Sequence, residues 1–497
     1  MNYASTRNSS LKVTSAHAIV KGLSDEGGLY VPESIPKFSK EEILGLCDKS
    51  YVERAYTVFS KFLTDFTSEE LRHCVESAYN DKNFDTNNIA EITKLNGGKY
   101  ILELWHGPTC AFKDMALQIL PYLLTTSAKK TVDGKHIAIL VATSGDTGKA
   151  ALEGFKDVAG TSISVFYPED GVSPMQKRQM TTQEGKNVNV CAVKGNFDDC
   201  QNGVKAIFTD KSIEDKLAAN NVLLSSANSI NWGRLAPQII YYVSTYAQLV
   251  KDNEIEYGDK VNIVVPTGNF GNILAAYYAK LMGIPVNKLI CASNSNNVLT
   301  DFINTGVYDR NRHFYTTISP SMDILISSNL ERLLYHLTDE NDKLINEWFG
   351  ALKTSGKYEV NDEVKNKLSE LFYAGCCNDD ETKAEIRKTF EEEHYLLDTH
   401  SAVAVKVYDD YKAKTGDDTK TIIASTANPY KFGRAVFDAV NGGKQPDDEF
   451  ELISLLEKET DTKMPAPLAA TKNKTVRFTG VVDKQDMGKV VLDFLNK

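Results

Sequence analysis

The sequence contains no long apolar run and no excess of positive charge. Of its 497 residues 42% are hydrophobic, yet no apolar run reaches the length that crosses a membrane. The first ten residues lack the apolar core of a signal peptide. The formal net charge of -11 argues against broad nucleic-acid binding. We therefore expect a cytoplasmic protein that binds neither membranes nor nucleic acids.

Cysteine is also scarce for a chain of this length. Eight cysteines are scattered along it, and no pair has the spacing of a zinc site. This number is too small for a disulfide scaffold, so we expect free thiols in a reducing compartment. We predict no metal site.

The apolar pattern that is present changes near residue 96. Before it, residues 15–23, 40–63 and 68–80 carry apolar side chains at three- and four-residue spacing. This spacing predicts amphipathic helices. Residues 1–95 are therefore expected to form a separate N-terminal helical unit.

Beyond residue 96, short apolar runs alternate with helical segments. The predicted strands are 99–105, 136–144, 161–168, 260–267, 288–293 and 420–427. Strand, tight glycine turn and helix in repetition indicate an α/β fold built on parallel sheets. Residues 320–395 interrupt this rhythm with helical and highly charged segments, which predicts a helical insertion on the surface of the core.

One lysine is set apart by its neighbours. In HGPTCAFKDMALQ, residues 106–118, Lys113 stands between Phe112 and Asp114 at the start of an apolar run. An apolar setting lowers the pKa of a lysine and favours the neutral amine, which can form an imine with an aldehyde. An exposed lysine on a helix is the alternative for this tripeptide alone.

Two glycine-rich turns each join a predicted strand to a helix. In TSGDTGKAA (143–151), Gly145 and Gly148 let the backbone approach a ligand, and the N–H groups at the helix start can bind an anion. PTGNFGN (266–272) has the same context and permits an N–H nest that suits a terminal phosphate. Tight turns with capped helices are the alternative. Neither turn has the GK[ST] of a Walker loop or the GxGxxG of a dinucleotide site.

Two further segments supply a hydroxyl and a cation. In STANPYKF (425–432), Ser425 or Thr426 could place its hydroxyl at the carboxyl edge of a sheet. In SSANSINWGRLAPQ (225–238), Arg234 could hold a phosphate bidentately. The alternatives are a helix-capping hydroxyl and a surface arginine. An imine-forming lysine, two anion-binding turns and a late hydroxyl together indicate a pyridoxal 5'-phosphate site.

Taken together, these segments resemble the threonine synthase family, whose members are fold-type II pyridoxal-phosphate enzymes. The combination of FKD, SGDTG and GNFGN is specific, and the resemblance spans nearly the whole chain. The matching segments are STR (5–7), GLSDEGGLYVP (22–32), LELWHGPTCAFKD (102–114), LVATSGDTG (140–148), VFYPEDGVSPMQKRQM (165–180), KGNFDDCQ (194–201), NSINWGR (228–234), PTGNFGNILAAYYAK (266–280) and DTHSAVA (398–404).

The resemblance implies a tryptophan-synthase-β-like fold, with parallel sheets that carry helices on both faces. We accordingly expect three parts. They are the N-terminal helical unit at 1–95, a small domain at 131–229, and a large cofactor-binding domain formed by 96–130 and 230–497, with the insertion at about 320–395.

The same resemblance implies roles for individual residues. Lys113 would be the catalytic residue that bonds covalently to the cofactor, Thr426 would face the pyridine nitrogen, and Arg234 would hold the substrate phosphate. The other cofactor-binding residues would be Phe112, Gly268, Asn269, Phe270, Gly271 and Asn272. The other substrate-binding residues would be Ser144, Asp146, Thr147, Asn228, Ser229 and Asn231.

Two positions depart from the family pattern. Asn428 stands where many relatives have a histidine, which removes any role of that imidazole. Asp146 stands where related type II enzymes often have asparagine. A carboxylate facing a substrate carboxylate would repel it, so we expect Asp146 to act through its backbone N–H.

The implied activity is the conversion of O-phospho-L-homoserine and water to L-threonine and phosphate by a monomer or homodimer. A phospholyase or dehydratase with the same cofactor would release a 2-oxo acid instead. A non-catalytic homologue or a nucleotide-binding regulatory protein is the third alternative. The intact Lys113 and the missing GK[ST] argue against it.

Overall fold

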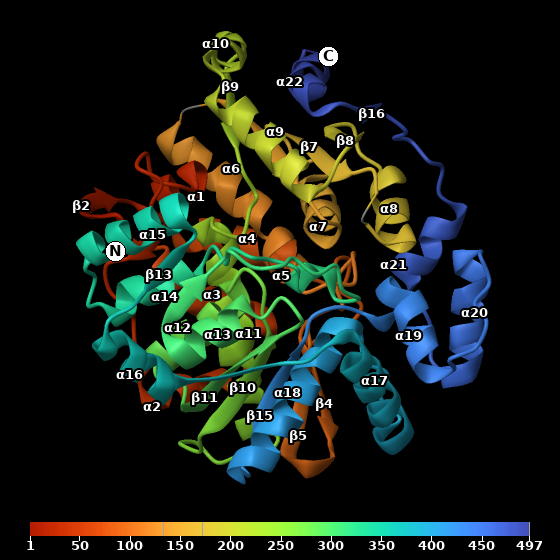
Figure 1. The fold of residues 1–497 in the computed structure, drawn as a ribbon. Helices are drawn as coiled ribbons and strands as arrows, with labels where there is room; N and C mark the ends of the chain where they lie inside the picture. The colour runs from red at the N-terminus through yellow and green to blue at the C-terminus, as the bar shows by residue number, and fades with distance from the viewer. Residues whose placement is uncertain (133, 171, 497) are drawn as a thin grey trace.

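The fold is built on two separate sheets, which a computed structural model describes for residues 1–132, 134–170 and 172–496 (Figure 1). The larger sheet has the strand order β14-β11-β10-β15-β5-β4. Its strands are β4 (Glu91–Leu95), β5 (Lys99–Glu103), β10 (Val261–Pro266), β11 (Val286–Ser293), β14 (Phe372–Cys376) and β15 (Thr421–Ser425). β4 pairs antiparallel with β5, and the other pairings are parallel.

The smaller sheet is parallel throughout, in the order β16-β8-β7-β6-β9. Its strands are β6 (His136–Ala142), β7 (Thr161–Pro168), β8 (Val188–Val193), β9 (Val222–Ser225) and β16 (Val481–Val482). Its helices are α7 (Asp146–Phe155), α8 (Pro174–Thr181), α9 (Phe197–Thr209), α10 (Lys211–Ala219) and α22 (Met487–Leu495). The two predicted strands 136–144 and 161–168 are thus confirmed as β6 and β7, which are neighbours in the interior of this sheet.

Both faces of the larger sheet are buried, as the continuous apolar runs of its strands require. In β10, Ile263 and Val265 belong to one apolar cluster and Val264 to another, so successive side chains enter different layers. α11 (Trp232–Lys251), α12 (Gly271–Leu281) and α13 (Val298–Thr305) lie on one side, and α18 (Thr399–Thr415) lies on the other (Figure 1). The fold-type II arrangement, with helices on both faces, is confirmed.

The remaining helices surround this core. After α18 come α19 (Gly433–Val440), α20 (Glu449–Thr460) and α21 (Ala466–Ala469). Before α18 comes α17 (Asp379–Glu393). Two further helices, α5 (Asp114–Leu117) and α6 (Leu120–Thr131), follow β5. Short 3-10 turns are η1 (Asn96–Gly98), η2 (Pro320–Met322), η3 (Pro429–Phe432), η4 (Ala470–Asn473) and η5 (Lys484–Asp486). No helix among the described residues is both long and apolar enough to cross a membrane.

The N-terminal unit differs from its prediction in two respects. Its helices are α1 (Ser15–Lys21), α2 (Lys40–Leu46), α3 (Tyr51–Phe62) and α4 (Ser68–Ala78), and capping boxes begin the last three. It also contains an antiparallel sheet of β1 (Tyr3–Ser5), β2 (Asn8–Val13) and β3 (Tyr30–Pro32). Residues 91–95 are not helical but form β4 at the edge of the larger sheet.

The segment 481–495 joins the smaller sheet rather than the predicted large domain. β16 pairs with β8, and α22 packs on α9. Figure 1 shows α22 beside α10 and α9. Met487 and Val491 share an apolar cluster with Ile207, so this position is where α22 buries its apolar face.

Residues 320–395 are more than a surface insertion. They contain α14 (Leu330–Leu337), α15 (Asp342–Ser355) and α16 (Asp362–Leu371), and β13 (Lys357–Glu359) pairs with β12 (Val307–Asp309). They also supply β14, the edge strand of the larger sheet. In addition, Ser321 of η2 lies 3.5 Å from Lys113, and Asn329, which precedes α14, lies 3.1 Å from the Asn269 carbonyl.

Candidate active site

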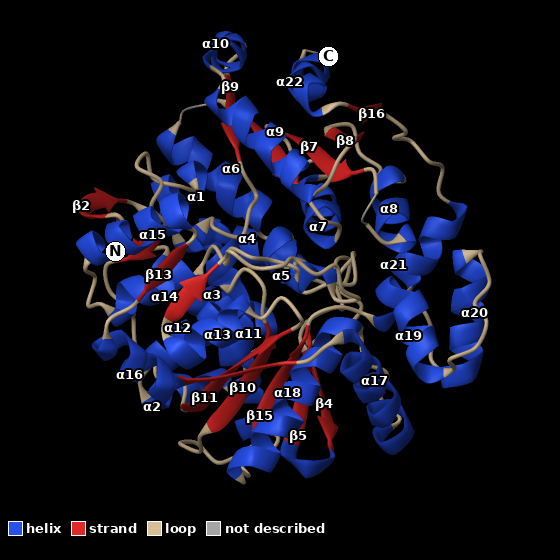
Figure 2. Cartoon of the chain, viewed as in Figure 1, coloured by secondary structure: helices blue, strands red, loops and turns tan. Residues whose placement is uncertain are grey.

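Lys113 lies where the loop after β5 enters α5. Figure 2 shows α5 beside the group of loops that separates the two sheets. β5 and β15 are neighbours in the larger sheet, so the segments that follow them run side by side. The Phe112 N–H donates to the Thr426 carbonyl at 2.8 Å, and Ala111 forms a bridge with Ala427. The sheet therefore brings the FKD and STANPYKF segments together.

The Lys113 amine is largely buried among polar partners. Its Nζ lies 3.5 Å from Ser321 Oγ and 3.8 Å from Asp146 Oδ2. Burial lowers the pKa of Lys113; the Asp146 carboxylate opposes this, and the positive charges of Lys431 and Arg234 add to it. The net lowering favours the neutral amine that a nucleophile or base requires.

The turn after β6 is held by a buried threonine. Thr143 Oγ1 accepts hydrogen bonds from the N–H groups of Gly145 at 3.0 Å and Gly148 at 2.9 Å. Within the described ranges, the N–H groups of Asp146 and Thr147 have no protein acceptor. The start of α7 therefore offers donors to an anion, and Ser144 beside it is partly exposed.

Asp146 was expected to act through its backbone N–H, but its side chain also has partners in the site. Its Oδ1 pairs with Lys431 Nζ at 3.0 Å and accepts from Gln176 Nε2 at 2.9 Å. Burial by itself would raise the pKa of Asp146, but Lys431, Lys113 and the Gln176 hydrogen bond together hold this pKa well below its usual range. The carboxylate is thus ionised and already neutralised by a buried cation.

Lys431 was missed by the sequence analysis, although it lies within STANPYKF. It belongs to η3, and its side chain is fully buried. Its Nζ also donates to the Thr109 carbonyl at 2.7 Å and to Gln179 Oε1 at 3.0 Å. The sequence signal that could have identified Lys431 was its position within STANPYKF, a segment already assigned to the site.

The turn after β10 forms an open cradle of N–H groups. Phe270 takes the left-handed conformation, with φ 62°, and begins α12. The backbone N–H groups of Asn269 to Asn272 have no acceptor in the part of the chain that the structure describes. A Cβ on Gly268 would lie 2.7 Å from the Ser321 carbonyl oxygen, so a glycine is needed for η2 to approach this turn.

Asn272 presents an unused donor in this cradle. Its Oδ1 accepts from the hydroxyls of Tyr241, at 2.8 Å, and Tyr242. These bonds fix the amide, and its buried Nδ2 has no partner among the described residues. A buried donor without an acceptor is costly unless a ligand supplies one.

Arg234 lies in the first turn of α11, and Asn231 sets the start of that helix. Asn231 Oδ1 accepts from the Gly233 N–H at 2.8 Å, and its Nδ2 donates to the Ile19 carbonyl at 2.8 Å. These bonds favour a positioning role for Asn231. Arg234 Nη1 bonds the Ala227 carbonyl, while its buried Nε has no acceptor within the described residues. Burial lowers the pKa of Arg234 to about 10, which leaves it charged at neutral pH.

Asn329 joins the predicted substrate and cofactor segments and was also missed. Its Nδ2 lies within hydrogen-bond distance of the carbonyls of Ser229 at 3.3 Å and Asn269 at 3.1 Å. Its Oδ1 accepts from Arg332 at 2.6 Å. Asn228, by contrast, is exposed.

The structure distinguishes between the two candidate hydroxyls after β15. Ser425 Oγ accepts from Trp105 Nε1 and from Ser401 Oγ, both at 3.1 Å. Thr426 is buried one residue further on, at the carboxyl edge of the strand. Because the Ser425 hydroxyl is used in these protein contacts, the geometry favours Thr426 as the hydroxyl that would contact a ligand. Asn428 caps η3 by accepting from the Tyr430 N–H at 3.1 Å.

A histidine of the DTHSAVA segment fixes the position of η2. His400 Nε2 accepts from the Ser321 N–H at 3.1 Å, and its Nδ1 bonds Asp398 Oδ1 at 3.0 Å. Both side chains are buried. The pair fixes Ser321 between Lys113 and the cradle at 268–272.

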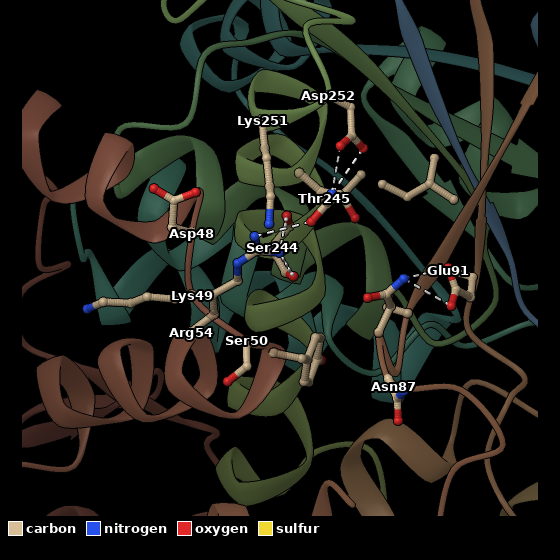
Figure 3. Close-up of a pocket in the computed structure, with 15 residues that line it drawn as sticks. Asp48, Lys49, Ser50, Arg54, Asn87, Glu91, Ser244, Thr245, Lys251 and Asp252 are labelled. Atoms are coloured by element: carbon tan, nitrogen blue, oxygen red, sulfur yellow. Dashed lines mark hydrogen bonds between the residues drawn. The ribbon is translucent and has the colours of Figure 1, made fainter. Parts of the chain in front are cut away.

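A surface pocket of about 310 Å³ lies elsewhere, between α3, β4 and α11 (Figure 3). Much of its polar lining is paired internally, for example Gln248 with Asp252 at 2.9 Å and Asn88 with Glu91 at 3.0 Å. None of the predicted site residues lines this pocket.

The chain is also similar to known proteins. Three family models match successive parts of the chain: a threonine synthase N terminus over residues 2–79, a pyridoxal-phosphate dependent enzyme over 85–346 and a threonine synthase C-terminal part over 401–490. A threonine synthase of Saccharomyces cerevisiae is 38% identical over 88% of this chain and 89% of its own length.

A human protein named threonine synthase-like 1 is 42% identical over 86% of this chain, which spans 58% of that relative's length. The structure of a PLP-bound threonine synthase from Brucella melitensis is similar over 99% of both chains, with a TM-score of 0.88 and 35% identity. The chain belongs to the threonine synthase family of pyridoxal-phosphate-dependent enzymes.

Proposed function

We propose that this protein converts O-phospho-L-homoserine and water to L-threonine and phosphate with pyridoxal 5'-phosphate. The observation that carries the proposal is a buried lysine with a lowered pKa, set among two N–H-rich turns and a buried arginine. A reaction on a phosphorylated amino acid with this cofactor needs two phosphate sites and one carboxylate site. The candidate site has donors for all three.

The residues present fit the cofactor. The cradle at 269–272 and the unpartnered Asn272 Nδ2 suit its phosphate. Lys113 would carry the covalent bond, and Thr426 would face the pyridine nitrogen. When bound, the cofactor would accept electron density from the substrate α-carbon.

The substrate would be held by groups that the cofactor does not use. The Asp146 and Thr147 N–H groups, with the Ser144 hydroxyl, would bind its carboxylate. Arg234 would bind its phosphate, which would satisfy the buried Nε. Asn228 and Ser229 lie in the loop that leads to Arg234, and we propose that they complete this phosphate site.

Lys113 would move the protons. As the neutral amine, it would take the α-proton and then a β-proton, and the bond from the γ-carbon to the phosphate oxygen would break. A proton would then be delivered to the γ-carbon, which becomes the methyl group, water would add at the β-carbon, and the α-carbon would regain its proton. Burial of the site would limit the entry of other water.

Product analysis tests this proposal. The purified protein is incubated with pyridoxal phosphate and O-phospho-L-homoserine, and amino acids, phosphate and 2-oxo acids are measured. Threonine and phosphate in equal amounts are expected. Phosphate with 2-oxobutyrate would instead identify a phospholyase, and no phosphate release would refute the substrate assignment.

We further propose a cytoplasmic monomer or homodimer. All eight cysteines are free thiols in the structure, which suits a reducing compartment. Light scattering of the purified protein and cell fractionation would test the two statements. A larger assembly, or recovery in an oxidising compartment, would contradict them.

A further inference from the structure

A second lysine, Lys431, contacts the candidate site without a role in the proposed chemistry. It is fully buried, and a buried ammonium group is costly unless it is paired and hydrogen-bonded. It meets this condition through Asp146, Thr109 and Gln179, at 2.7–3.0 Å. Its counter-ion is therefore the carboxylate that also faces Lys113.

The two oxygens of Asp146 are used differently. Oδ1 receives both Lys431 at 3.0 Å and Gln176 at 2.9 Å. Oδ2 is directed to Lys113, at the longer distance of 3.8 Å. One carboxylate thus forms a close ion pair with one lysine and a looser contact with the other.

This division has a chemical consequence. A buried carboxylate without a counter-ion would take Lys113 as its partner and hold it as an ammonium, which cannot attack an aldehyde or take a proton. We propose that Lys431 is a positioning residue that serves as the counter-ion of Asp146 and so leaves the Lys113 amine free to react. This inference rests on the proposed function, because it concerns the amine that would bind the cofactor.

The same arrangement assists Lys113 once it has taken up a proton. The resulting ammonium lies 3.8 Å from Asp146 Oδ2, which stabilises its charge. This contact is longer than a close ion pair, so it does not prevent Lys113 from giving up the proton again. The other charges that act on Lys113 are those of Arg234 on α11 and Asp114 on α5. They stay in place in the variants below.

The test follows the protonation of Lys113 rather than turnover. The full chain with pyridoxal phosphate is treated with borohydride over a pH series, and the trapped adduct at Lys113 is measured by peptide mass spectrometry. Lys431→Met should raise the pH at which trapping is half-maximal by about one unit. At a fixed pH below this midpoint, about tenfold less adduct should be trapped. Asp146→Asn should move the midpoint down, and the double variant should return close to the wild type.

Two controls separate charge from structure. Lys431→Arg keeps the charge and should keep the wild-type midpoint to a large extent. Lys280→Met removes a half-buried lysine of α12, whose Nζ donates to the Val286 carbonyl, and should leave the midpoint unchanged. Thermal unfolding shows that each variant is folded. If Lys431→Met does not fold, Asp146→Asn and Lys431→Arg still decide the question.

Equal midpoints for the wild type and Lys431→Met, or a shift in the same direction for both single variants, would overturn the proposal. Acetylation of Lys113 by acetic anhydride over the same pH series measures the same amine without the cofactor. Failure of the wild type to bind pyridoxal phosphate would therefore refute the proposed function, while the acetylation midpoints would still support or overturn the role of Lys431.

Discussion

Within the FKD segment, Lys113 and Asp114 are adjacent but have different tasks. Lys113 faces the site, whereas the fully buried Asp114 accepts from the Thr109 N–H at 2.8 Å and from the Thr109 hydroxyl at 2.7 Å. Asp114 therefore fixes the loop that precedes the lysine. Both residues can be tested separately.

Replacement of Lys113 by alanine should abolish turnover, because it removes the amine that would bond to the cofactor and move the protons. Phosphate release from O-phospho-L-homoserine measures the effect, with Lys280→Ala as the control. A Lys113→Ala protein that still releases phosphate at a rate near that of the wild type would refute the role given to this residue.

Asp114 should make stability depend on pH. Burial raises the pKa of Asp114 to about 6, so the folded state binds a proton that the unfolded state releases near pH 4. The free energy of unfolding should therefore fall by at most about 1.4 kcal/mol per pH unit as the pH rises between these values, and the contribution should be constant above them.

Urea unfolding of the wild type and Asp114→Asn over this pH range checks the slope. The variant should lack it, so the difference between the two proteins should change with pH. A difference that stays constant from pH 4 to pH 7 would contradict this assignment.

How far single residues could be predicted depends on where their partners lie in the sequence. Lys113, Gly268 and Arg234 were identified because their own neighbours carry the signal. Ser321 and Asn329 were not, since each acts through a contact with a segment that is distant in the sequence. The same holds for Lys431, whose partner Asp146 begins α7, the helix that follows β6 of the smaller sheet.

At the scale of elements, the glycine turns depend on a close approach between segments. Gly268 allows the Ser321 carbonyl to lie against the cradle, and His400 holds Ser321 in place. Because η2 also contacts Lys113, its position links the lysine to the proposed phosphate site.

Gly268→Ala should weaken cofactor binding by at least about tenfold, because the added Cβ would displace η2 from the cradle. Fluorescence titration with pyridoxal phosphate measures the change. Gly350→Ala is the matched control, since no atom lies within 4 Å of its added Cβ in α15. Equal affinities in the two variants would show that this approach is not needed.

The predicted elements were those whose residues determine them locally. β6, β7, β10 and β15 were found because long apolar runs suit strands buried on both faces. By contrast, β1 and β3 have three residues each, and β2 is mostly polar, so none of them contains such a run. β14 was missed because it lies within a region of helical pattern and is a strand only through its pairing with β11.

At the scale of the whole molecule, segment 481–495 completes the smaller sheet from a great distance in the sequence. The buried side chains of Met487 and Val491 fill its outer layer. No local pattern indicates this partner, so the sequence analysis placed the segment in the large domain.

Met487→Ala should lower the free energy of unfolding by about 2–4 kcal/mol, because it leaves a cavity beneath α22. Lys489→Ala, at an exposed position of the same helix, should change it by less than about 0.5 kcal/mol. Urea unfolding measures both. Similar values for the two variants would mean that α22 contributes little to this layer.

The pairing of β16 with β8 also bears on how the protein is made. β8 ends at Val193, whereas β16 begins at Val481, so a ribosome must synthesise most of the large domain after β8 before this pair can form. Until then, the edge of β8 stays unpaired and the apolar surface beneath α22 stays uncovered. The smaller sheet is begun early in translation and completed late, so we expect the nascent chain to be most prone to aggregation during that interval.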